Sequence, residues 1–150
     1  MEQPDALHWR GRERLRLGLR LLMAVIYVGF GLLHVARSRG FLAIMPPWVP
    51  FPQEVVVFTG VCEILGGIGL LGPLPLRRVS GVMLALYAIG VFPANLYHAL
   101  SGVHVPGLPS SWWYHAPRLA FQPVFVWWAL FAGSVINWPW KRQSTSSARR

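Results

Sequence analysis

One apolar stretch decides the fold of this chain: VSGVMLALYAIGVFPANLYHAL, residues 79–100. About 20 apolar residues in a helix are enough to cross the hydrocarbon layer of a membrane. Three further stretches of similar length and character occupy residues 17–36, 55–72 and 119–136. The sequence therefore predicts an all-α protein, with a four-transmembrane-helix bundle forming one domain over residues 17–138.

Composition also indicates a membrane protein. The hydrophobic fraction is 54% and the charged fraction is 13%, whereas about a quarter of the residues of a soluble domain are charged. A net charge of +9 is compatible with nucleic-acid binding, but the basic residues gather at the ends of the apolar stretches. We therefore interpret this charge as a topology signal, with the lipid bilayer and no nucleic acid as partner.

The distribution of basic residues predicts the orientation of the bundle. Eleven lie before or at the start of the first stretch, between the second and third, or after the fourth, and three lie on the other side: Arg37, Arg39 and Arg118. The positive-inside rule then places both termini in the cytoplasm. We expect a basic cytoplasmic lead at residues 1–16 and a disordered cytoplasmic tail at residues 139–150.

Two connectors face the opposite side of the membrane from the termini. Residues 45–52 contain four prolines within seven positions, which exclude a continuing helix. Trp48 in this segment is suited to the headgroup level, where aromatic rings anchor. We expect the first connector, residues 37–54, to lie on the outer surface or to fold down as a lid. The second, residues 101–117, is also expected to be interfacial.

Six polar side chains interrupt the apolar stretches: His34, Glu63, Asn95, His98, Arg118 and Gln122. Such groups are costly in lipid and usually mark a functional site or a lock between helices. At a rise of about 1.5 Å per residue, all six fall at the midplane or in the outer half, with Glu63 near the midplane. Glu63 also shares its helix face with Gly60, Gly66 and Gly67, and small residues at this spacing mark helix–helix contacts. We predict a polar pocket between the helices, with these six residues and Trp48 as candidate ligand-binding residues.

Several of these residues have alternative roles. Glu63 would be neutral if it were isolated, because desolvation disfavours a charge, or ion-paired if Arg118 or a charged His34 lay nearby. Arg118 could instead extend to the outer headgroups. Asn95 and Gln122 lie beside prolines and could bind the backbone carbonyls that a proline leaves free. His34 and His98 are more often hydrogen-bonded than metal-bound in such positions, and no zinc-like spacing occurs, so no metal site is expected.

Five motifs recur in order along the chain: Gly31-Leu32-Leu33-His34, Met45-Pro46-Pro47-Trp48-Val49-Pro50, Thr59-Gly60-Val61-Cys62-Glu63-Ile64-Leu65-Gly66-Gly67, Val91-Phe92-Pro93-Ala94-Asn95-Leu96-Tyr97 and Arg118-Leu119-Ala120-Phe121-Gln122-Pro123. In this order they resemble the DoxX-like family of small bacterial membrane proteins with four spans. The resemblance implies a multi-pass protein of the bacterial inner membrane. It also implies a link to respiratory or thiol redox systems, through a quinone-linked thiosulfate oxidoreductase subunit.

Three functions are compatible with these observations. The first is a redox-associated membrane subunit that binds a quinone-like or other small amphipathic ligand through Glu63, His34, Arg118 and Gln122. The sequence shows no binding motif for an intrinsic redox cofactor, so a redox partner protein would supply the electrons. The second is a small proton-coupled transporter that uses Glu63. The third is a non-catalytic assembly or scaffold subunit. Whether the chain is an enzyme or a homo-oligomer is left open by the sequence.

Overall fold

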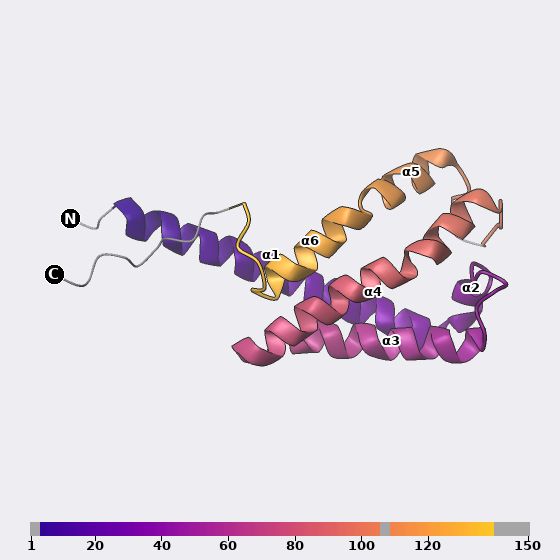
Figure 1. Ribbon diagram of the computed structural model, residues 1–150, viewed down its shortest axis with the longest axis horizontal. Coiled ribbons are helices and arrows are strands. Elements are labelled where there is room, and N and C mark those ends of the chain that lie inside the picture. The colour runs from indigo at the N-terminus through magenta and orange to yellow at the C-terminus, as the bar shows by residue number, and fades with distance from the viewer. Residues whose placement is uncertain (1–3, 106–108, 140–150) are drawn as a thin grey trace.

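The computed structural model describes residues 4–105 and 109–139, with side chains from residue 11 onward, and every regular element in these ranges is an α-helix. The all-α prediction is therefore confirmed. The helices follow one another as α1 (Pro4–Ala36), α2 (Ser38–Leu42), α3 (Pro52–Gly69), α4 (Leu74–Leu100), α5 (Trp112–Ala120) and α6 (Gln122–Ala132) (Figure 1).

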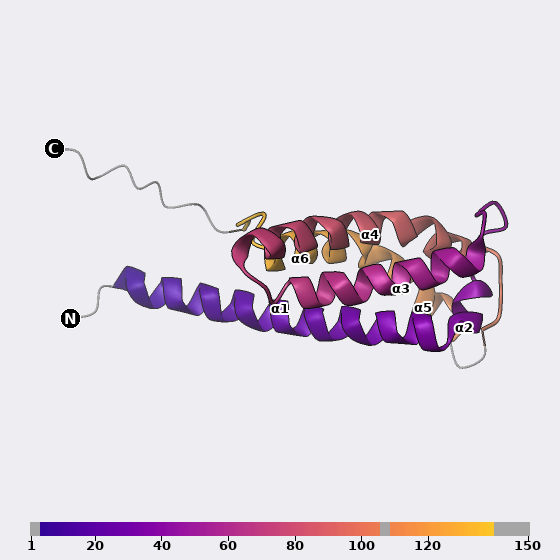
Figure 2. The ribbon, with the colours of Figure 1, turned by 90° about the horizontal axis from the view of Figure 1, so that it is seen from below.

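The long helices run side by side in an elongated bundle. Helix α1 packs along α3, α4 packs against both α3 and α6, and α6 also contacts α1. Figures 1 and 2 show α2 and the start of α5 together at one end. The α3–α4 turn and the last turn of α6 lie at the other end, where the first part of α1 extends past the bundle. Following the predicted orientation, we call these the outer end and the inner end.

The fourth apolar stretch is not the continuous helix expected over residues 119–136. It belongs to two helices, α5 and α6, with a break at Phe121. Pro123 explains the break, because proline has no N–H with which to bond the carbonyl of Leu119 one turn earlier. Helix α6 then ends at Ala132, since Ser134 adopts a left-handed conformation with φ of 59°.

The first helix also differs from expectation at its start. Helix α1 begins at Pro4, so the basic lead is helical and continuous with the first apolar stretch. The predicted tail lies outside the described residues from position 140 onward, and so do four of the basic residues counted for topology: Lys141, Arg142, Arg149 and Arg150.

Within the described residues, two helices are long and apolar enough to cross a membrane by length and composition: residues Gly11–Ala36 of α1, and α4 over Leu74–Leu100. Helix α3 has 18 residues and carries two carboxylates, Glu54 and Glu63, and the fourth stretch is divided. A bundle in which four segments cross the membrane is therefore a proposal.

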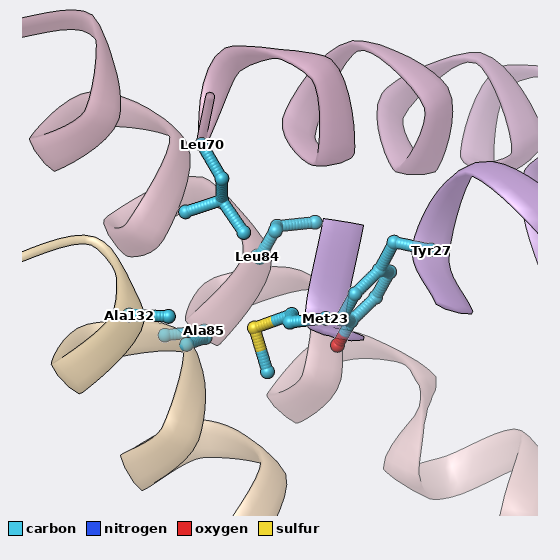
Figure 3. Close-up of a cluster of buried hydrophobic side chains, with 7 residues drawn as sticks. Met23, Tyr27, Leu70, Leu84, Ala85 and Ala132 are labelled. Carbon is cyan, nitrogen blue, oxygen red and sulfur yellow. The ribbon is translucent and has the colours of Figure 1, made fainter. Parts of the chain in front are cut away.

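Close helix contacts and a small apolar core hold the bundle together. A Cβ atom on Gly31 of α1 would lie 2.6 Å from the carbonyl oxygen of Gly60 in α3, so the two backbones touch at this point. The glycines predicted to mark the contact face of α3 are buried. Nearer the inner end, Figure 3 shows core side chains from α1, α4, α6 and the end of α3: Met23, Tyr27, Leu70, Leu84, Ala85 and Ala132.

Candidate functional site

The six polar residues predicted to form one pocket belong to two separate groups of contacting side chains. The first joins His34 of α1 to Glu63 of α3. The second joins Asn95 and His98 of α4 to Arg118 of α5 and Gln122 of α6. We call them the carboxylate pair and the arginine network.

The carboxylate pair lies at the contact between α1 and α3. Glu63 is 4% exposed, as expected from the small residues on its face, and its Oε2 atom lies 2.7 Å from Nδ1 of His34. Close contact of the glycines makes this approach possible: a Cβ atom on Gly60, three residues before Glu63, would lie 2.7 Å from the Cβ atom of His34. Glu63 is therefore paired with His34, whereas Arg118 has other partners.

One oxygen of this carboxylate lacks an aligned hydrogen-bond donor. Nδ1 of His34 also lies 3.0 Å from the carbonyl oxygen of Phe30, and its N–H direction favours that carbonyl. Oε2 of Glu63 thus stays close to Nδ1 without an aligned hydrogen bond among the described residues. The side chain of Tyr87 in α4 lies near the same carboxylate. A buried carboxylate with spare acceptor capacity can take a proton or bind a donor.

Aromatic rings enclose the carboxylate pair. The ring of Phe41 in α2 stacks on His34, with centroids 3.6 Å apart and planes 22° from parallel. On the inner side, Tyr27 contacts Tyr87 edge to face with centroids 6.0 Å apart. The first connector, expected to lie on the surface or to fold down as a lid, therefore covers His34 with its short helix α2.

The arginine network is a continuous chain of hydrogen bonds across three helices. Arg118 donates from Nη1 to Nδ1 of His98 at 3.0 Å and from Nη2 to Oδ1 of Asn95. Asn95 donates to Oε1 of Gln122 at 3.3 Å, and Gln122 donates to the carbonyl oxygen of Ala88. Arginine only donates, so Nδ1 of His98 accepts and the proton of the neutral ring lies on Nε2.

These contacts decide between the alternatives for this group. Arg118 is directed inward to His98 and Asn95 rather than to the headgroups. Asn95 and Gln122 do not bind carbonyls freed by a neighbouring proline, because Asn95 binds two side chains and Gln122 binds Ala88, whose helical partner Phe92 retains its N–H. The network ties the broken fourth stretch to α4.

His115 is a member of this region that the sequence did not reveal. It is 4% exposed and meets the 2% exposed His98 edge to face, with ring centroids 4.9 Å apart. The sequence predicts a connector over residues 101–117, which includes His115, but α5 begins at Trp112 and includes Pro117. Its position three residues before Arg118, on one helix face, was the available signal.

Trp48 lies apart from both groups of hydrogen bonds. It is exposed in the first connector, and its ring meets Tyr97 near the end of α4 with centroids 5.7 Å apart. In the parts of the chain that the structure describes, no three histidine, cysteine or acidic side chains come together as metal ligands.

Two arginines at the inner end have a role beyond topology. Arg20 is 7% exposed and donates from Nε to the carbonyl oxygen of Ala132 at 2.9 Å and from Nη2 to Ser134 at 3.3 Å. Arg16 donates to Asn137 at 2.8 Å and to the carbonyl oxygen of Ile136. A cation at the carboxyl end of a helix is favourable, so α1 closes the end of α6.

Comparison with known proteins identifies the family to which this chain belongs. Residues 23–133 match the family described as domain of unknown function DUF8561, and this match is not an assignment to the DoxX-like family. The matched segment contains the carboxylate pair and the arginine network, whereas Arg16 and Arg20 precede it. No curated protein and no solved structure matches the chain.

Proposed function

The chain belongs to the DUF8561 family, and we propose that it is a DoxX-like integral membrane protein that binds the polar head of a quinone-like ligand at the carboxylate pair. The observation that carries this proposal is the buried carboxylate of Glu63, 2.7 Å from His34, with one oxygen that has no aligned donor. A buried ionisable group between membrane helices is most often retained for ligand or proton chemistry.

The exposed surface supports four membrane crossings. Large apolar side chains are exposed on α1, α3, α4 and α6, for example Val25, Phe58, Leu86 and Val124. A soluble protein rarely exposes apolar area along all of its main helices, whereas lipid-facing helices require it. Helices α5 and α6 together cover residues 112–132, which is about the length of one crossing.

The chemistry of the carboxylate pair fits a quinone head. A quinone carbonyl oxygen accepts a hydrogen bond, which a protonated His34 or Glu63 donates, and the quinol hydroxyl donates one back to the carboxylate. Reduction of the quinone takes up two electrons and two protons. A redox partner protein supplies the electrons, and the carboxylate pair lies where it can pass the protons. The rings of Phe41 and Tyr27 offer contacts for the ligand ring.

The test is binding of a short-chain quinone to the protein in mild detergent. We expect quinone to raise the thermal unfolding midpoint of the native protein and of Glu54→Gln, which removes an exposed acid from the same helix. Glu63→Gln should lose most of this rise. If no quinone copurifies and none stabilises the native protein, the proposal is wrong.

A proton-coupled transporter is the second candidate, and the break at Phe121 favours it. Transporters bind their substrates beside discontinuous helices, and α5–α6 is such a helix. Reconstituted vesicles with an imposed pH gradient separate the two candidates, since a transporter accumulates its substrate and Glu63→Gln abolishes the accumulation. A scaffold subunit, the third candidate, predicts that Glu63→Gln changes stability alone.

A further inference from the structure

We propose that the inner end of the bundle holds the headgroup of an anionic phospholipid, bound mainly by Arg77 and Arg78 at the start of α4. This inference rests on the membrane placement proposed above, but not on the quinone site, which lies towards the other end. It assigns a ligand to a group of arginines whose positive charge is not neutralised by acidic side chains nearby.

Arginines from two helices gather around the end of α6. Arg16 and Arg20 of α1 bind its last residues, and the backbone carbonyl of Arg77 lies beside Gly133, where an added Cβ atom would meet it at 3.0 Å. The charges of Arg16 and Arg77 both act on Arg20. Arg78 is exposed next to Arg77.

Little negative charge compensates this group. Among the side chains described here, Glu13 is the acidic neighbour, and its Oε1 atom lies 3.7 Å from Arg16. Arg77 donates from Nη2 to the carbonyl oxygen of Gly72, while its Nε has no acceptor in the described residues. The first turn of α4 holds no acid and no capping side chain, and the positive end of the helix dipole adds to the arginine charges.

Apolar residues beside the arginines favour a lipid over a free anion. Leu15 and Leu17 on α1, and Leu74, Leu76 and Val79 on α4, are each about half exposed. Leu17 follows Arg16 and Val79 follows Arg78 in the direction of the predicted hydrocarbon layer, whereas Leu15, Leu74 and Leu76 lie on the inner side of the arginines. A headgroup phosphate held by arginine, with its acyl chains along Leu17 and Val79, satisfies the charge and covers this apolar surface.

The experiment titrates phosphatidylglycerol into the full chain in a neutral detergent and follows the thermal unfolding midpoint. Phosphatidylcholine and inorganic phosphate are the parallel arms. We expect stabilisation by phosphatidylglycerol alone. The variant Arg77→Gln/Arg78→Gln should bind it about 30-fold more weakly, since one basic residue near an anionic surface contributes roughly fivefold. The matched control, Arg37→Gln/Arg39→Gln, removes two exposed arginines at the outer end and should bind normally.

Arg78→Gln alone keeps the hydrogen bond from Arg77 to Gly72 and serves if the double variant does not fold; it should weaken binding about fivefold. Equal affinity of the inner-end variants and the control overturns the assignment of the site. Equal stabilisation by inorganic phosphate overturns the lipid and leaves a free anion. Quinone binding by Glu63→Gln is measured separately, and its outcome affects neither the assignment of the lipid site nor the choice between lipid and free anion.

Discussion

Helices α1 and α3 touch at Gly31, and this contact makes a prediction in which a neighbouring glycine serves as the control. A Cβ atom on Gly31 would lie 2.6 Å from the carbonyl oxygen of Gly60, 2.7 Å from Cγ1 of Ile64 and 3.0 Å from its backbone nitrogen. Ordinary C···O contacts start near 3.3 Å. Two of the three atoms are backbone, so Gly31→Ala must push the helices apart by about 0.7 Å at this point.

Gly29, two residues earlier on the same helix, has nothing within 4 Å of its added Cβ atom. Glycine to alanine in a helix stabilises by about 0.5–1 kcal/mol when there is space. Both variants gain this stabilisation from replacing glycine by alanine, so it cancels when their unfolding free energies are compared. What remains is the cost of forcing an extra methyl group into a closed contact, which is about 1–3 kcal/mol.

The assay is thermal unfolding of the two variants and the native protein in the same detergent. For a chain of this size, 1 kcal/mol shifts the midpoint by about 2–4 °C. We therefore expect Gly29→Ala to melt slightly above the native protein and Gly31→Ala to melt roughly 2–12 °C below Gly29→Ala. Equal midpoints for the two variants would refute the close contact of α1 and α3. Because His34 lies one turn after Gly31, the Gly31→Ala variant should also bind quinone more weakly than the native protein.

Two further predictions concern arginines that join the helices, each checked by the unfolding midpoint at fixed detergent. Arg118→Lys should destabilise by about 1–2 kcal/mol, because one ammonium group cannot reproduce the fork that bonds His98 and Asn95 together; an unchanged midpoint would mean that the network contributes nothing. Arg20→Met should destabilise by about 1–3 kcal/mol, because the carbonyl group of Ala132 loses its buried donor, and a midpoint equal to that of the native protein would contradict this capping role.

The helical class and the burial of Glu63 could be predicted from the sequence because both follow from local spacing. Long apolar stretches encode helices directly, and glycines at positions 60, 66 and 67 place Glu63 on a contact face. The contact itself requires backbones to approach closely, which only small residues permit. The spacing of small residues along the sequence therefore predicts that Glu63 is buried, even when the partner helix is not known.

The pairing of the polar residues could not be predicted in the same way. Which of Arg118 and His34 would meet Glu63 depends on how the fourth stretch packs, and Pro123 breaks that stretch at Phe121. Two other prolines, at positions 93 and 117, lie inside helices without ending them, so a proline alone does not say where a helix stops. The same ambiguity applies to His115, because Pro117 two residues later is compatible both with a loop and with the helix α5 that the structure shows.

Consecutive residues of α4 explain why one predicted pocket became two groups with different roles. The side chain of Tyr87 lies near the carboxylate of Glu63, whereas the carbonyl of Ala88 accepts a hydrogen bond from Gln122. Helix α4 thus stands between the groups and contacts both. The arginine network links four side chains and the carbonyl of Ala88 in one chain of hydrogen bonds, which is how a lock between helices is built. The carboxylate pair leaves an oxygen of Glu63 without an aligned donor, and an unsatisfied buried acceptor costs about 1–3 kcal/mol, which a proton or a ligand would offset. The proposed ligand chemistry therefore rests on His34 and Glu63, whereas the arginine network joins the broken fourth stretch to α4.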